Sequence, residues 1–164
     1  MITTAWFFGE KNLTDVHFIR RAVFIEEQGI SEADEMDGTD HMCAHLVAYD
    51  ENGAPAATGR ILVTRDEFII GRVAVMPTYR KQQYGTLIMQ TLIRACNAMG
   101  GTKQLIHSQL SAKGFYEKLG FYAVGDVYEE AGIPHVTMVH EGDAEIFCAL
   151  CAEKTFVKFD EAHN

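Results

Sequence analysis

A basic turn between an apolar strand and a helix is the part of this sequence best suited to chemistry. Residues Phe68 to Met76 are nearly all apolar, which predicts a central strand covered on both faces. Arg80 and Lys81 follow in a polar turn, and apolar residues then recur at helical spacing from about Gly85. The first turn of a helix presents unpaired N–H groups and a partial positive charge. We therefore expect residues 80–86 to form a cradle for a pyrophosphate group.

A plain connection with solvated basic side chains explains the same turn equally well. The spacing of a Walker phosphate loop, G-x-x-x-x-G-K-[ST], is absent. The turn by itself therefore leaves phosphate binding and a plain connection both open.

Length and composition limit the kind of protein that carries this turn. The chain has 164 residues, of which 48% are hydrophobic and 23% charged, so we expect one packed domain spanning residues 1–164. Its net charge is −9, which makes nucleic acid and anionic membrane surfaces poor partners. Residues 1–11 lack the basic lead and apolar stretch of a secretory signal, and we expect a cytoplasmic protein.

The cysteines do not form a convincing redox or metal site. Without a signal peptide, reduced and buried thiols are expected at Cys43 and Cys96. Cys148 and Cys151 have C-x-x-C spacing, but no second pair or nearby histidine completes a zinc set. We interpret them as two incidental thiols on a C-terminal element and expect no metal.

Periodicity and turn residues predict a mixed α/β, or α+β, sheet with helices on its faces. The expected strands are Thr4–Phe8, Ala44–Tyr49, Ala56–Thr64, Phe68–Met76, Lys103–Leu110, Phe121–Val124 and His135–His140. The expected helices start near Asn12, Gly85 and Ser111 and end at Gly29, Met99 and Leu119. The tail from Glu141 fits a helix and a strand about equally, and residues 141–164 stay unassigned.

The first helix and the acidic segment after it carry two further expectations. Asn12 is placed to cap the helix, whose apolar face is expected to include Phe18, Ala22 and Ile25 beside Val16, Ile19 and Val23. Residues 26–40 are acidic and are interpreted as a loop. Such a loop is either simply solvated or attracts a cationic substrate by its field.

Three groups of motifs resemble the GNAT superfamily of N-acetyltransferases. Arg80 and Gly85 fill the first and last positions of its [Q/R]-x-x-G-x-[G/A] turn, whereas Gln83 replaces the middle glycine. That replacement matters if the backbone there needs a positive φ. Residues 112–121, Ala-Lys-Gly-Phe-Tyr-Glu-Lys-Leu-Gly-Phe, closely resemble the family's next helix and strand. Segments 23–28, 107–109 and 132–135 look like the ElaA-like bacterial branch, so the resemblance covers about residues 4–140.

The resemblance implies a mostly antiparallel sheet with two splayed central strands and acetyl-CoA as co-substrate. Backbone groups of residues 73–75 would hold the pantetheine and thioester, with Gln109 on the opposite strand. The residues that would bind the cofactor are Val73, Ala74, Val75, Arg80, Lys81, Gln82, Gln83, Tyr84, Gly85, Thr86, Gln109 and Phe115.

The resemblance also implies direct attack of an amine on the thioester. Tyr116 matches the family's proton-donor position, its alternative role being a tyrosine packed on an amphipathic helix. The base is open among Glu26, His107 and His135, each of which could equally be structural. The acceptor would be a small-molecule or protein amine, and a homodimer stays open. A non-catalytic acyl-CoA-binding or sensing module is the alternative function, which retention of Tyr116 disfavours.

Overall fold

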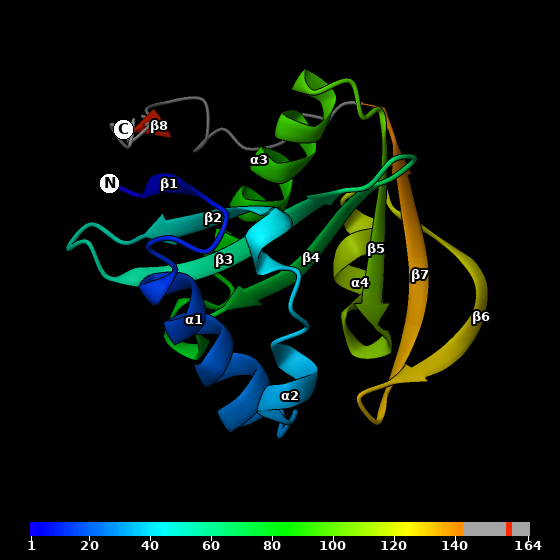
Figure 1. Ribbon diagram of the computed structural model, residues 1–164, viewed down its shortest axis with the longest axis horizontal. Coiled ribbons are helices and arrows are strands. Elements are labelled where there is room, and N and C mark those ends of the chain that lie inside the picture. Colours follow the sequence, from blue (N-terminus) through cyan, green and yellow to red (C-terminus); the bar gives the residue numbers. More distant parts are fainter. Residues whose placement is uncertain (143–156, 159–164) are drawn as a thin grey trace.

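The protein is an eight-stranded sheet with helices on both faces (Figure 1). The computed structural model describes residues 1–142 and 157–158. The strands are β1 Thr3–Phe8, β2 Cys43–Tyr49, β3 Pro55–Val63, β4 Phe68–Val75, β5 Lys103–Gln109, β6 Tyr122–Glu130, β7 Ile133–Glu141 and β8 Val157–Lys158. The α-helices are α1 Thr14–Arg20, α2 Glu32–Glu35, α3 Tyr84–Ala98 and α4 Lys113–Lys118. The π-helix η1 Arg21–Glu27 continues α1, and the 3₁₀ turns are η2 Asp40–Met42, η3 Pro77–Tyr79 and η4 Leu110–Ala112.

The two central strands of the sheet pair over only part of their length. The strand order is β6-β7-β5-β4-β3-β2-β1-β8, and neighbours are antiparallel except at β4–β5 and β1–β8. The parallel β4–β5 ladder joins residues 68–70 to residues 104–106 and then stops. Figure 1 shows the two strands adjacent at the upper end and diverging below. The mostly antiparallel sheet with splayed central strands is therefore confirmed.

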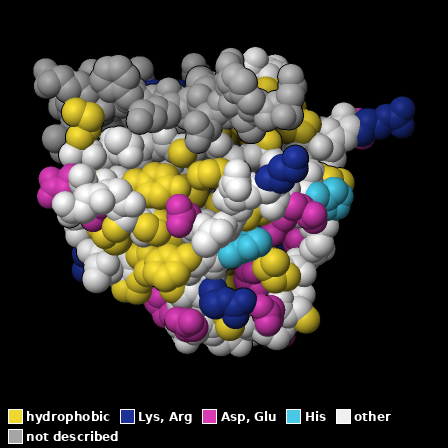
Figure 2. Space-filling model, turned by 60° about the vertical axis from the view of Figure 1, so that its left-hand side comes forward, with side chains coloured by type: hydrophobic (Ala, Val, Ile, Leu, Met, Phe, Trp, Pro, Cys, Tyr) yellow, Lys and Arg dark blue, Asp and Glu magenta, His cyan; other side chains and the backbone are white. Residues whose placement is uncertain are grey.

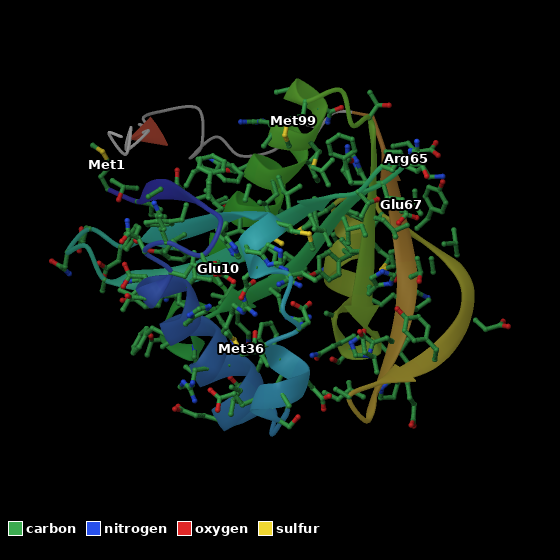
Figure 3. All side chains as sticks on the ribbon, in the orientation of Figure 1. Met1, Glu10, Met36, Arg65, Glu67 and Met99 are labelled. Atoms are coloured by element: carbon green, nitrogen blue, oxygen red, sulfur yellow. The ribbon has the colours of Figure 1, made fainter. Side chains whose placement is uncertain are left out.

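Two cores hold the sheet, one on each face. The larger core packs the apolar face of α3, including Ile88 and Leu92, against β3 and β4. A smaller core places Val16 and Ile19 of α1 against Val47 of β2. Because side chains alternate along a strand, adjacent residues of β2 enter opposite cores. The hairpin turn of β3–β4, labelled at Arg65 and Glu67 in Figure 3, lies at the end of the sheet where β4 and β5 still pair.

The first helix differs from its sequence prediction at both ends. Asn12 has a left-handed backbone (φ 60°) and Leu13 takes the N-cap position without a side-chain cap, so the predicted Asn12 cap is wrong. The helix becomes a π-helix from Arg21, which adds a residue to each turn and shifts the buried face. Phe18, within the regular part of the helix, is 54% exposed while Phe24 is buried, so the expected place of Phe18 on the apolar face is wrong.

Two of the remaining expectations concern the cysteines and the C-terminal tail. Cys43 and Cys96 are buried free thiols, as predicted, and burial raises the pKa of Cys96 to about 12. Cys148 and Cys151 lie outside the described residues, as does all of the tail after residue 142 except β8. Within the described part of the chain, no helix is long and apolar enough to cross a membrane.

Candidate active site

A cavity of about 390 Å³ lies where β4 and β5 diverge. Its walls come from residues 69–73 of β4 and residues 106–109 of β5. Helices η1 and α2 contribute on one side, and α4 with the β6–β7 turn on the other. Of the predicted site residues, Val73, Gln109, Tyr116, His107 and His135 line this cavity. Glu26, Ala74, Val75, Phe115 and the predicted cradle, residues 80–86, lie outside its lining. The splay therefore brings together residues far apart in the sequence.

The free edge of β4 presents backbone groups to the cavity. Met76 donates its N–H to the Ala56 carbonyl of β3, so by alternation Val75 and Val73 direct their N–H and C=O groups to the other edge. β5 has already separated from β4 along that stretch, and no ladder occupies these groups. Arg72 has a left-handed backbone (φ 50°) beside a register shift between β3 and β4, which marks a bulge at this point. These groups fit the predicted thioester-binding role of residues 73–75.

The predicted phosphate cradle has the geometry that its glycine motif would require. Lys81 and Gln83 both have left-handed backbones, with φ of 60° and 67°. Gln83 is the N-cap of α3 and therefore occupies, as a non-glycine residue, the conformation that the family's middle glycine adopts freely. The first N–H groups of the helix, from Tyr84 to Thr86, have no partner one turn earlier within the helix. The loop can thus direct several N–H groups at one anion.

Gly85 sets the distance between the cradle and the neighbouring helix α4. A Cβ atom at Gly85 would lie 3.2 Å from Cζ of Phe115 and 3.5 Å from Cγ2 of Val75. The absence of a side chain therefore lets the start of α3 pack closely on α4 and on β4. The three predicted cofactor-binding segments meet at this glycine.

Arg80 is held by a carboxylate from another element. Its Nη1 and Nη2 donate to the two carboxylate oxygens of Glu27 at 2.7 and 2.6 Å. Its Nε donates to the Val75 carbonyl at 3.1 Å. Both side chains are about 40% exposed, so the pair is weakly held and can be exchanged for a phosphate. Gln82, also predicted for the cradle, donates its side-chain amide to the Thr78 carbonyl at 2.8 Å.

Tyr116 lies in the cavity with its hydroxyl available. The side chain is 9% exposed and packs edge-on against Phe115 and Phe121, with ring centroids 5.0 and 5.8 Å away. Within the described residues, no group hydrogen-bonds its hydroxyl. Burial raises the pKa of Tyr116, because the phenolate would be desolvated. The phenol therefore stays protonated at neutral pH.

The two histidines that line the cavity, His107 of β5 and His135 of β7, are connected through Tyr128. His135 is buried, and its Nδ1 donates to the Ile133 carbonyl at 2.7 Å, which leaves Nε2 as the acceptor nitrogen of the neutral ring. A carboxylate oxygen of Glu130 lies 3.8 Å from that Nε2. Tyr128 stacks on His135 at 6.0 Å, and its hydroxyl lies 2.9 Å from Nδ1 of His107. The sequence did not single out Glu130, because only the β6–β7 turn brings it to His135.

The acidic segment is an internal ion-pair network rather than a solvated loop. Three arginines and three acids take part, Arg20, Arg60, Arg72, Glu35, Asp37 and Asp40, and their formal charges cancel. Asp40 accepts hydrogen bonds at 2.7 Å from both Arg20 and Arg60. Burial opposes ionisation of Asp40, but these two arginines outweigh it and lower its pKa to about 2. The same contacts correct the prediction of a loop, because Glu35 and Asp40 are buried and α2 forms within the segment.

Charges on the outside of the molecule are similarly mixed. On the face shown in Figure 2, acidic and basic side chains are interspersed and no large patch of one sign forms. Within the described residues, no group of three or more histidine, cysteine or acidic side chains could hold a metal ion.

Splayed central strands, a helix that begins beside β4 and α4, and a buried tyrosine in the cavity are features expected of an acyl-CoA-dependent N-acyltransferase. Residues 22–141 match the family described as acetyltransferase (GNAT) domain. The chain therefore belongs to the GNAT acetyltransferase family and is an acyltransferase enzyme, and acetyl-CoA is the acetyl donor that this family uses.

Relatives of known sequence and structure agree with this assignment. YyaT of Bacillus subtilis is 39% identical over 135 residues, which cover 80% of this chain and 90% of YyaT. ElaA of Escherichia coli is 31% identical over 131 residues, 75% of this chain and 83% of ElaA. The crystal structure of Escherichia coli ElaA superposes with a TM-score of 0.76, covering 86% of this chain and all of that one at 29% identity. An acyl-CoA N-acyltransferase from Pseudomonas aeruginosa gives a TM-score of 0.76 at 27% identity, covering 85% and 99% of the two chains. The resemblance to the ElaA-like branch is thus confirmed.

Proposed function

We propose that the protein transfers the acetyl group of acetyl-CoA to a primary amine by direct attack, with Tyr116 as general acid. The observation that carries this proposal is the Tyr116 hydroxyl, which lines the cavity and has no hydrogen-bond partner among the described residues. A hydroxyl kept protonated by burial and free of other acceptors can donate to a departing thiolate.

The cofactor would be held by backbone groups already oriented for it. The N–H groups at the start of α3 and in the adjacent loop would bind the pyrophosphate, and Arg80 would exchange Glu27 for a phosphate. Lys81 adds charge at the same loop. Val73 and Val75 would hydrogen-bond the pantetheine and the thioester along the unpaired edge of β4.

Bound acetyl-CoA supplies a thioester carbonyl that an amine can attack. The amine nitrogen forms a bond to the carbonyl carbon, the C–S bond breaks, and the sulfur takes the proton of the Tyr116 hydroxyl. The Val73 N–H is the donor placed to stabilise the oxyanion. Solvent then returns a proton to Tyr116.

His135 is the base that the geometry favours. The attacking amine must lose a proton, and Nε2 of His135 is an acceptor that lines the cavity. The nearby Glu130 carboxylate would stabilise the imidazolium that forms. Glu26 is exposed on η1 and outside the cavity lining, so it would have to act through water.

Replacing Tyr116 by phenylalanine tests the proposal. Free CoA thiol is measured during turnover with an amine panel, and acetyl-CoA binding is measured by calorimetry. Tyr116→Phe should lower kcat by about 10²-fold with an unchanged dissociation constant for acetyl-CoA. Tyr122→Phe, an exposed tyrosine on β6, is the matched control and should keep full activity. Wild-type kcat in Tyr116→Phe, with chemistry rate-limiting, would remove Tyr116 from the mechanism.

A further inference from the structure

Arg72 is the arginine of the ion-pair network that keeps unpaired N–H donors. Its Nε and Nη2 donate to the Glu35 carbonyl at 3.3 and 3.0 Å. Nη2 also reaches the Asp34 carbonyl and the Asp37 carboxylate, each at 3.3 Å. Within the described residues, Nη1 donates to nothing. The side chain is 26% exposed and lines the cavity, so a nitrogen with two unpaired N–H groups is available at the edge of the space in which the acceptor would bind.

The other two arginines of the network have no such capacity. The Arg20 side chain is 1% exposed, and all three of its nitrogens donate to Glu35 or Asp40. Arg60 places both terminal nitrogens on Asp37 and Asp40. These ion pairs fix the acids that hold Arg72, and therefore fix the guanidinium itself. A donor fixed in this way needs little ordering when it binds a ligand.

We propose that Nη1 of Arg72 binds a carboxylate of the acceptor, so that the preferred substrate is an amine that also carries a carboxylate. This inference rests on the proposed function and names its substrate class. It differs from the expectation of a cationic acceptor attracted by the acidic segment, because three of the acids of that segment, Glu35, Asp37 and Asp40, are already paired with arginines.

Charge on the cavity wall favours a carboxylate over a phosphate. The carboxylates of Asp34 and Glu130 also line the cavity. They would repel a dianion strongly and a monoanion less, and they favour the protonated amine at the other end of the substrate. One free guanidinium nitrogen with two N–H groups matches a single carboxylate.

The carboxylate and the amine of such an acceptor would contact different walls of the cavity. Arg72 is held against the carbonyls at the end of α2, whereas Tyr116 and His135 come from α4 and β7. Arg72 also directly precedes Val73, the proposed oxyanion donor. A carboxylate on Arg72 would therefore fix the position of the amine relative to the acetyl carbonyl.

A chain-length series of acceptors tests the idea by activity. Glycine, longer ω-amino acids up to 6-aminohexanoate, and L-amino acids are compared with their carboxamides, which keep the amine and lose the charge. Dipeptides with free and amidated C-termini separate a free amino acid from a peptide end as the source of the carboxylate. We expect at least one acid to have a kcat/KM about 10- to 100-fold above that of its amide, the range of a charged hydrogen bond.

Binding of the N-acetylated products gives a readout that does not depend on turnover. The N-acetyl derivatives of the same acids and amides are titrated by ligand-observed NMR in the presence of CoA. The wild type should bind one or more acids at least about 10-fold tighter than the matching amide, and Arg72→Gln should abolish the difference. Arg72→Lys keeps the charge and should restore part of it.

Arg21→Gln is the matched control. Like Arg72, Arg21 contacts α2: it pairs with Glu32 at 2.5 Å. Arg21 is exposed and outside the cavity lining, however, so this change should leave the preference for acids intact. If Arg72→Gln does not fold, the inference is tested by comparing the binding of each acid with that of its amide in the wild type and in Arg72→Lys. Equal binding of every acid and its amide by the wild type would overturn the inference, and so would an acid preference that survives in Arg72→Gln. An enzyme that acetylates amines without this preference keeps the proposed function. If the protein transfers no acetyl group but binds the acids through Arg72, the proposed function is wrong and this inference stands.

Discussion

Gln28 and Gln109 form a hydrogen bond between the two sides of the cavity. Nε2 of Gln109, on the last residue of β5, donates to Oε1 of Gln28 at 2.7 Å. Gln28 follows η1, so this contact joins the helical wall to the strand that has separated from β4. Both side chains line the cavity, and each fixes the orientation of the other's amide.

This pair predicts coupled effects on cofactor binding. Gln28→Ala and Gln109→Ala should each change the dissociation constant of acetyl-CoA by about 5-fold, the size of one net hydrogen bond. The double variant should do no more than the larger single change, because either substitution already breaks the contact. Calorimetric titration of the three variants measures the coupling. Strictly additive effects would show that the two glutamines act independently.

The phosphate cradle is tested at Gly85. Gly85→Pro removes one backbone donor in the first turn of α3, a place where helices tolerate proline. Gly85→Ala keeps the donor but adds the Cβ that would lie 3.2 Å from the Phe115 ring. We expect Gly85→Pro to weaken acetyl-CoA binding about 10-fold more than Gly85→Ala does. Equal affinities in two folded variants would place the pyrophosphate elsewhere.

Close packing of α3 on the sheet is tested at Gly59. A Cβ there would lie 2.7 Å from Cδ1 of Leu92 and 2.9 Å from Cγ2 of Ile88, so Gly59→Ala forces α3 away from β3. We expect the free energy of unfolding to fall by about 1–3 kcal/mol in urea denaturation. Gly71→Ala on β4 is the control, because a Cβ there meets nothing within 4 Å. A smaller loss at Gly59 than at Gly71 would contradict this account.

Stability should depend on acid pH through Asp40. The Asp40 pKa is about 2 in the folded protein against an ordinary 3.8, so below about pH 4 the unfolded chain binds the proton first. The contribution of this group, roughly 2 kcal/mol, is therefore present above about pH 4 and lost as the pH falls toward 2.

Urea unfolding at a series of pH values measures this dependence. Asp40→Asn should be less stable at neutral pH, because Arg20 and Arg60 lose a charged partner, and it should show a shallower loss in acid. Asp66→Asn, on the β3–β4 turn, should keep the wild-type slope. An unchanged slope in Asp40→Asn would assign the acid dependence to other groups.

Local sequence patterns predicted the part of the site that comes from one continuous segment, residues 68–98. Strand β4, the turn and helix α3 follow one another in the chain. A nearly continuous apolar run marks the strand, basic and polar residues mark the turn, and an apolar period of 3.6 residues marks the helix. The turn at Gln83 shows the limit of such reasoning. Its left-handed backbone follows from the position in the turn and not from the residue type.

The cavity wall that contains the acids of residues 35–40 depends on contacts between distant segments. The acids of residues 35–40 meet arginines at positions 20, 60 and 72, and only the register of β3 and β4 with α1 decides that they pair. From sequence they are indistinguishable from solvated residues. The burial of Phe24 and the exposure of Phe18 are similarly hidden, since both residues are apolar.

The length of the β4–β5 ladder has a consequence for how the molecule could be divided. Residues 1–75 and 103–141 each form a continuous part of the sheet. The two parts are joined by the three-residue ladder, the core beneath α3 and α4 and the Gln28–Gln109 hydrogen bond, and β8 pairs with β1. Figure 1 shows the chain crossing between them through α3 and the turn after it. Breaking the chain in that turn, at Gly100 and Gly101, would give two fragments whose reassociation creates the cavity. Enzyme activity would then report directly on the meeting of the two halves.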